Sequence, residues 1–118
     1  MYGLRETDIA EINKVLAQFD EVHYAIIFGS RAKGNYRNGS DVDIALKGDH
    51  LSHHNLIRIS SILNEETMMP YRFDVLDYYT ITNSELIAHI DSLGKLLYGS
   101  QERTIHNEPN TNCNPPSL

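Results

Sequence analysis

The sequence predicts an α/β (α+β) domain in which a small mixed or antiparallel sheet of three to four strands is flanked by helices. Two hydrophobic patterns support this fold class. Apolar residues recur at helical spacing in three segments, residues 6–18, 52–65 and 84–92. Apolar runs of strand length fill three other segments, residues 21–28, 41–47 and 71–77. Because the two patterns alternate along the chain, we expect helices packed on a single sheet.

Start signals mark the expected helices. Thr7 is the expected N-cap of the first helix, and Ser52 stands near the start of the second. Thr82 precedes Glu85 by three residues, a capping-box pattern ahead of the third helix. A further short helix is expected over residues 30–35, between the first two strands.

The strand segments differ in how deeply they should be buried. Residues 21–28 form the expected central strand, because a near-continuous apolar run indicates burial on both faces. Residues 71–77 carry both apolar and charged side chains, which indicates one buried and one exposed face. Residues 94–99 are compatible with a closing strand or with a last turn.

The composition indicates one small cytoplasmic domain. A chain of 118 residues with 41% hydrophobic residues allows a single core, and we expect it over residues 1–102, with residues 103–118 as a flexible tail. The net charge of -6 provides no basic field for a polyanion, so we expect no direct nucleic-acid binding. No apolar stretch has membrane-spanning length, the N-terminus lacks a signal-peptide pattern, and Cys113 is the sole cysteine. We therefore expect neither membrane contact nor an internal disulfide.

Two short motifs around residues 29–43 combine a phosphate cradle with a pair of acids. Gly29 has no Cβ, so backbone N–H groups can approach a phosphate closely, and Ser30 adds a hydroxyl beside the start of the short helix. Asp41 and Asp43 are two residues apart in an extended segment, so their side chains point to the same side. Paired carboxylates suit Mg²⁺, which completes its shell with water and substrate phosphates.

Further charged residues extend this candidate site. Asp74 is the best third carboxylate if its strand pairs beside that of Asp41 and Asp43; Asp77 is its rival and faces the opposite side. Arg31 and Lys33 follow the Gly-Ser pair and are either phosphate ligands or ordinary exposed helix residues.

The segment from residue 28 to residue 46 resembles the nucleotidyltransferase superfamily related to DNA polymerase beta, whose motif is Gly-Ser, a spacer of about ten residues, and Asp-x-Asp. The small size of the chain makes it similar to the minimal, single-domain MNT nucleotidyltransferases, antitoxins that are encoded beside HEPN-domain toxins. The resemblance covers residues 1 to about 100. It implies the minimal nucleotidyltransferase fold, ATP as substrate, and two Mg²⁺ ions held by Asp41, Asp43 and Asp74. It also implies transfer of AMP to a tyrosine of a cognate HEPN ribonuclease toxin.

Three functions remain open at this point. The first is the AMP-transferring antitoxin. In this case a partner protein, bound in a hetero-oligomer, would complete the part of the site that holds the acceptor. The second is a non-catalytic antitoxin that masks its toxin by contact, although a pure binder has no need of three converging carboxylates. The third is a nucleotidyltransferase that acts on a small molecule such as an aminoglycoside, or on a nucleic-acid end. The lack of an acceptor domain and the acidic charge both weaken this third reading.

Overall fold

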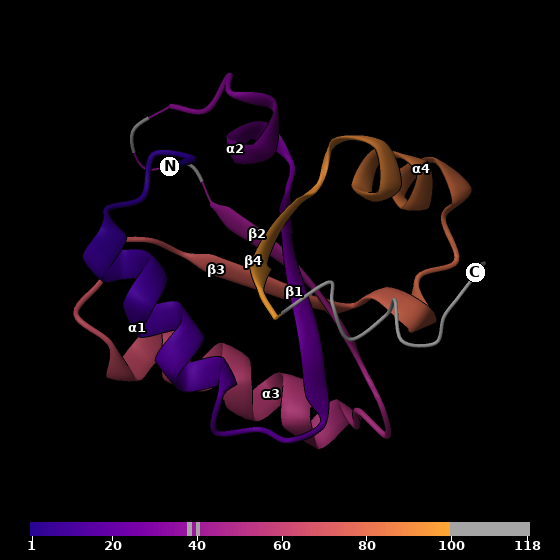
Figure 1. Ribbon diagram of the computed structural model, residues 1–118, viewed down its shortest axis with the longest axis horizontal. Coiled ribbons are helices and arrows are strands. Elements are labelled where there is room, and N and C mark those ends of the chain that lie inside the picture. The colour runs from indigo at the N-terminus through magenta and orange to yellow at the C-terminus, as the bar shows by residue number, and fades with distance from the viewer. Residues whose placement is uncertain (38, 40, 100–118) are drawn as a thin grey trace.

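A four-stranded mixed sheet forms the centre of the structure, a computed structural model that describes residues 1–37, 39 and 41–99 (Figure 1). The strands, in chain order, are β1 (Val22–Phe28), β2 (Val42–Gly48), β3 (Phe73–Asp77) and β4 (Lys95–Tyr98). The α-helices are α1 (Glu6–Leu16), α2 (Ser30–Lys33), α3 (His53–Ser61) and α4 (Ser84–Leu93). The expected tail, residues 103–118, lies outside the described residues. None of the helices within the described part of the chain combines the length and the apolar character needed to cross a bilayer.

The strand order is β3-β2-β1-β4, with β1 antiparallel to both of its neighbours and β2 parallel to β3. The predicted mixed sheet with flanking helices is therefore confirmed. The apolar run of β1 is an inner strand, as predicted, because it pairs on both sides. Residues 95–98 form a strand rather than a last turn, since β4 pairs with β1.

The two faces of the sheet bury different hydrophobic clusters. The larger cluster includes Val42 and Ile44 of β2 and packs against α1 and α3. The smaller cluster joins Phe28 of β1 and Ala45 of β2 to α4, which lies on the other side of the sheet (Figure 1). Because alternate residues of a strand point to opposite faces, Asp43 lies on the face that α4 covers.

Two predicted helix caps are wrong. α1 begins after Arg5, whose backbone N–H donates to the Asp8 carboxylate at 3.0 Å, so Thr7 is not the N-cap. At α4 the cap is Asn83 and not Thr82. The Asn83 side chain accepts the backbone N–H groups of Glu85 and Leu86. In both cases the observed cap lies within two residues of the predicted one, a shift that a local motif alone cannot resolve.

The segment between α3 and β3 fixes the start of β3. The N-cap of α3 is Ser52, which the sequence placed near the start of this helix, and the helix continues beyond its last α-helical residue as a π-helical turn, η1 (Ile62–Glu66). Within that turn the Asn64 amide donates to the carbonyl of Phe73 at 3.0 Å and accepts its N–H at 2.7 Å. A side chain thus replaces the neighbouring strand that β3 lacks here, and it holds the residue directly before Asp74.

Candidate active site

Gly29 connects the end of β1 to α2 in a conformation that requires glycine. Its φ of 77° and ψ of -153° lie in a region that is essentially closed to residues with a side chain. A Cβ built at this position would also collide with the Asp43 carboxylate. The backbone of the Gly-Ser turn therefore lies directly against Asp43, one of the three expected carboxylates.

The register of the sheet brings two carboxylates together. Asp43 pairs with Phe28 on one side and with Asp74 on the other. Paired residues of adjacent strands point to the same face, so Asp43 and Asp74 are neighbours there. Asp43 is half-buried, whereas Asp41 and Asp74 are exposed.

Asp77, the rival third acid, has a structural position. It is buried, and its carboxylate accepts the backbone N–H of Tyr79 at 3.0 Å, which caps the 3-10 turn η2 (Tyr78–Thr80). It also lies three residues from Asp74 along β3 and so faces the opposite side of the sheet.

The surroundings of Asp43 disfavour its charged form. Burial raises the pKa of the Asp43 carboxyl, and the charges of Asp74 and Asp41 raise it further. His89 and Arg31 oppose this shift only in part. A cation between these carboxylates would relieve their repulsion, so the electrostatics favour one.

The donor set fits a hard divalent cation by its chemistry, because carboxylate oxygens are the ligands that Mg²⁺ takes in proteins. The backbone of the turn lies so close to this carboxylate that a Cβ on Gly29 would collide with it. Within residues 1–37, 39 and 41–99, no three His, Cys, Asp or Glu side chains converge closely enough to enclose a metal ion. Any ion here would therefore depend on ligands from substrate or water.

Arg31 is buried within the protein instead of pointing to solvent. Its guanidinium donates to the carbonyl of Tyr2 at 2.9 Å and to that of Asp41 at 3.3 Å. It also lies over the rings of Tyr36 and Tyr71, at 5.3 and 5.1 Å from their centroids. These contacts connect the N-terminal segment to the backbone of Asp41, so we leave Arg31 out of the phosphate-binding set proposed below.

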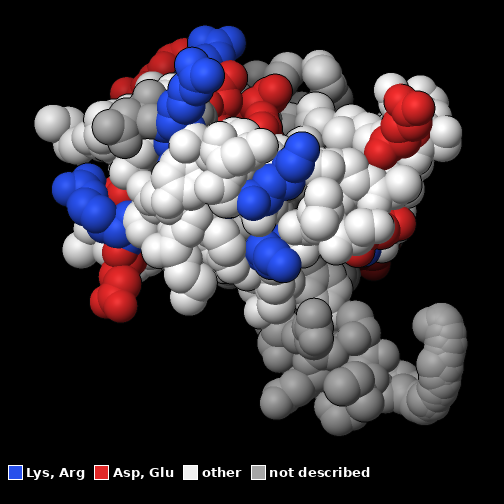
Figure 2. All heavy atoms as spheres, turned by 90° about the horizontal axis from the view of Figure 1, so that it is seen from above, with Lys and Arg blue, Asp and Glu red and all other residues white. Residues whose placement is uncertain are grey.

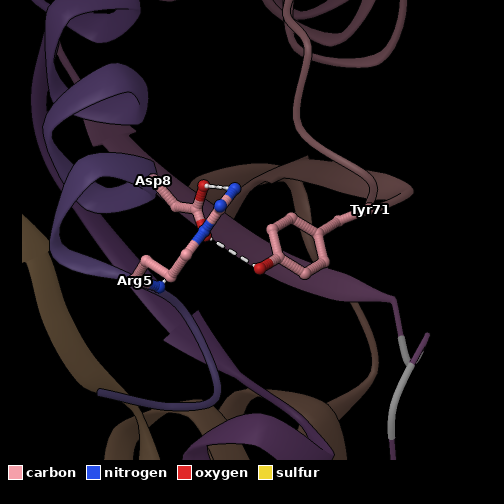
Figure 3. Close-up of polar contacts among 3 residues, drawn as sticks. All are labelled: Arg5, Asp8 and Tyr71. Carbon is pink, nitrogen blue, oxygen red and sulfur yellow. Dashed lines mark hydrogen bonds and ion pairs between the residues drawn. The ribbon is translucent and has the colours of Figure 1, made fainter.

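A second polar cluster continues this connection (Figure 3). Asp8 of α1 accepts the Tyr71 hydroxyl at 2.8 Å and two N–H groups of Arg5 at 3.0 and 3.1 Å. These hydrogen bonds, the one from Arg5 foremost, lower the pKa of the buried Asp8 to about 2. The cluster ties α1 to the segment that leads into β3.

Lys33 is exposed at the end of α2. Figure 2 shows the molecule from above, the end at which α2 lies in Figure 1. On this face Lys and Arg lie in small separate groups, with Asp and Glu among them, instead of forming a continuous basic surface. Lys33 is thus placed to meet a small anion at the turn, which remains a prediction.

His89 is a site residue that the sequence did not indicate. It lies on α4, 60 residues from Gly29, and its Nε2 accepts the Gly29 N–H at 2.9 Å. Its ring also meets Phe28 edge-on, with 6.2 Å between the centroids. A single histidine in an amphipathic helix carries no signal that would assign it to a turn so distant in the chain.

Comparisons with known proteins agree with this geometry. The family model described as "Polymerase beta, Nucleotidyltransferase" matches residues 10–103. No curated protein sequence matches significantly. Among solved structures, a toxin–antitoxin with AMP-PNP is 24% identical, with a TM-score of 0.66 over 85% of this chain and 77% of that one. A complex of a tri-AMPylated Shewanella oneidensis HEPN toxin with an MNT antitoxin is 20% identical, with a TM-score of 0.65 over 86% and 77%. A toxin–antitoxin MntA-HepT structure is 21% identical, with a TM-score of 0.64 over 84% and 76%.

At these identities the structural likeness establishes the fold, whereas the family match covers most of the chain. The matched region includes the turn at Gly29 and all three carboxylates, Asp41, Asp43 and Asp74. The chain belongs to the polymerase beta nucleotidyltransferase family.

Proposed function

We propose that this protein is a Mg²⁺-dependent nucleotidyltransferase antitoxin that transfers AMP from ATP to a tyrosine hydroxyl of a cognate HEPN ribonuclease toxin. One observation carries the enzymatic part: the glycine turn lies directly against Asp43, and Asp74 is the partner of Asp43 in the next strand. Phosphate donors and carboxylates thus meet at one end of one face of the sheet.

The turn would hold the β- and γ-phosphates of ATP. Ser30 supplies its hydroxyl, and the backbone N–H groups that follow Gly29 supply further donors. α2 is a single turn, so these individual hydrogen bonds contribute more than a helix dipole does. Lys33, exposed at the end of α2, adds a positive charge on the side from which a triphosphate would approach.

Asp41, Asp43 and Asp74 would hold the metal ions together with phosphate oxygens. When bound, two Mg²⁺ ions neutralise the triphosphate and lower the pKa of the attacking hydroxyl. Because burial and then the nearby carboxylates raise the pKa of Asp43, nucleotide-bound metal should be favoured over empty carboxylates.

In the transfer step, the tyrosine oxygen attacks the α-phosphorus of ATP in line with the bond to the β-phosphate. A new phosphorus–oxygen bond forms, the bond to the bridging oxygen breaks, and pyrophosphate leaves. Asp74 is exposed, so it can meet a hydroxyl brought by another protein and accept its proton. The products are AMP-tyrosine and pyrophosphate.

The acceptor tyrosine is proposed to belong to a partner protein. The similar structures named above are toxin–antitoxin complexes, one with a HEPN toxin that carries AMP, which supports a HEPN toxin as this partner. A stable complex of this kind would remove about 1,200 to 2,000 Å² of surface from water.

The test incubates the purified protein with ATP, Mg²⁺ and the HEPN toxin encoded beside it, then separates the toxin for intact mass and ribonuclease activity. We expect an inactive toxin whose mass has risen by whole AMP units. Asp43→Asn should abolish this gain, whereas Asp49→Asn, an exposed acid beyond the opposite end of β2, should not.

Two other results would contradict the proposal. An unmodified toxin that regains activity once it is separated would leave a binding antitoxin. AMP found on an added small-molecule acceptor, with none on the toxin, would instead indicate a small-molecule nucleotidyltransferase.

A further inference from the structure

The imidazole of His89, a residue of α4, contacts the end of β1. Its Nε2 lies 2.9 Å from the Gly29 nitrogen, and its ring packs edge-on against Phe28. The ring is half-buried on α4, the helix that covers the same face of the sheet as Asp43. His89 therefore joins α4 to the turn at which ATP is proposed to bind.

The Gly29 N–H needs an acceptor that the sheet does not provide. Pairing of β1 with β2 ends at Phe28, opposite Asp43, and pairing with β4 ends at Ile27. A backbone N–H just beyond a strand must find another partner. His89 supplies one from α4, on the side chain's acceptor nitrogen.

The turn that makes this contact lies against the Asp43 carboxylate. The Asp43 carboxylate is so close to Gly29 that a Cβ there would collide with it. A change in the direction of the turn would therefore move backbone that lies directly against Asp43. The hydrogen bond from Gly29 to the imidazole fixes the direction of the turn.

We infer that His89 is a positioning residue of the nucleotide site, which acts through Gly29 to hold the phosphate-binding turn in the shape that receives a Mg²⁺–nucleoside triphosphate. This inference rests on the proposed function. It assigns a role to α4, which contributes none of the carboxylates, and it requires an acceptor atom at this position rather than a histidine as such.

Two variants separate the acceptor from the packing of the side chain. His89→Gln retains an acceptor oxygen at a similar reach along the side chain, whereas His89→Leu fills comparable space without one. We expect His89→Leu to weaken calorimetric binding of Mg²⁺–AMP-PNP about fivefold, equivalent to about 1 kcal/mol for one hydrogen bond. His89→Gln should bind within about twofold of the wild type.

Kinetics and NMR provide readouts that packing alone would not move. In AMP transfer, His89→Leu should raise KM for ATP about fivefold and leave kcat within about twofold, because the side chain does not contact the reacting atoms. The Gly29 amide resonance, read without nucleotide, should shift in His89→Leu and return toward its wild-type position in His89→Gln.

Each remaining outcome decides against the inference in a distinct way. If the wild type binds Mg²⁺–AMP-PNP and His89→Leu binds it equally well, His89 has no role in the site while the proposed function stands. If both variants weaken binding alike, in proportion to their loss of melting temperature, the side chain only packs α4. If the wild type binds no nucleotide, the proposed function and this inference fail together.

Discussion

Replacing Gly29 with alanine is the sharpest test of the site geometry. The conformation of Gly29, φ 77° and ψ -153°, costs a residue with a side chain about 1 to 3 kcal/mol. The new Cβ also collides with the Asp43 carboxylate, which must move. We expect a loss of about 3 kcal/mol in the free energy of unfolding, and roughly 4 to 8 °C in melting temperature for each kcal/mol in a domain of this size.

Gly34→Ala is the matched control. Gly34 is also left-handed, with φ 87° and ψ 2°, but a Cβ there meets nothing within 4 Å. Its variant should lose only the backbone term, about 1 to 2 kcal/mol. The contact with Asp43 would be refuted if the melting temperature of Gly29→Ala equalled that of the wild type, or if it were no lower than that of Gly34→Ala. In an Asp43→Ala background, Gly29→Ala should cost measurably less, since the colliding carboxylate is gone.

Three further predictions follow from the charges. The pKa of Asp43 is raised in the folded protein, so wild-type stability should decline as the pH rises from about 4 through that raised pKa. Asp43→Asn should abolish this decline and stabilise the metal-free domain, which denaturant unfolding at pH 4 and pH 7 would measure. The pKa of Asp8 is lowered to about 2, so its contribution is present above pH 4 and disappears toward pH 2. Asp8→Asn should therefore be less stable by about 2 kcal/mol at pH 7, and an unchanged acid transition would contradict the ion pair with Arg5. Finally, calorimetric titration should show weak Mg²⁺ binding that becomes tighter when AMP-PNP is present. Equal Mg²⁺ affinities with and without AMP-PNP would count against the site.

The structure confirms the parts of the sequence reading that depend on short-range periodicity. Alternation along a strand placed Asp43 opposite in direction to its apolar neighbours, Val42 and Ile44, which are fully buried. The continuous apolar run of β1 marked an inner strand for the same reason, because a strand covered on both faces has no polar alternation. Ser52, expected near the start of the second helix, caps it, because its partner Asn55 lies only three residues away.

Contacts between distant segments depended on tertiary packing. The sequence made Asp74 a candidate on condition that its strand paired beside β2, and the parallel register set it opposite Asp43. Arg31 stands in the sequence like any exposed basic residue, yet packing buries it against two tyrosine rings. His89 reaches Gly29 across 60 residues because α4 folds back over the sheet. Residue types and spacing determine which groups a strand or turn presents, whereas the partner of each group depends on which elements pack together, and that is decided by burial of the whole core.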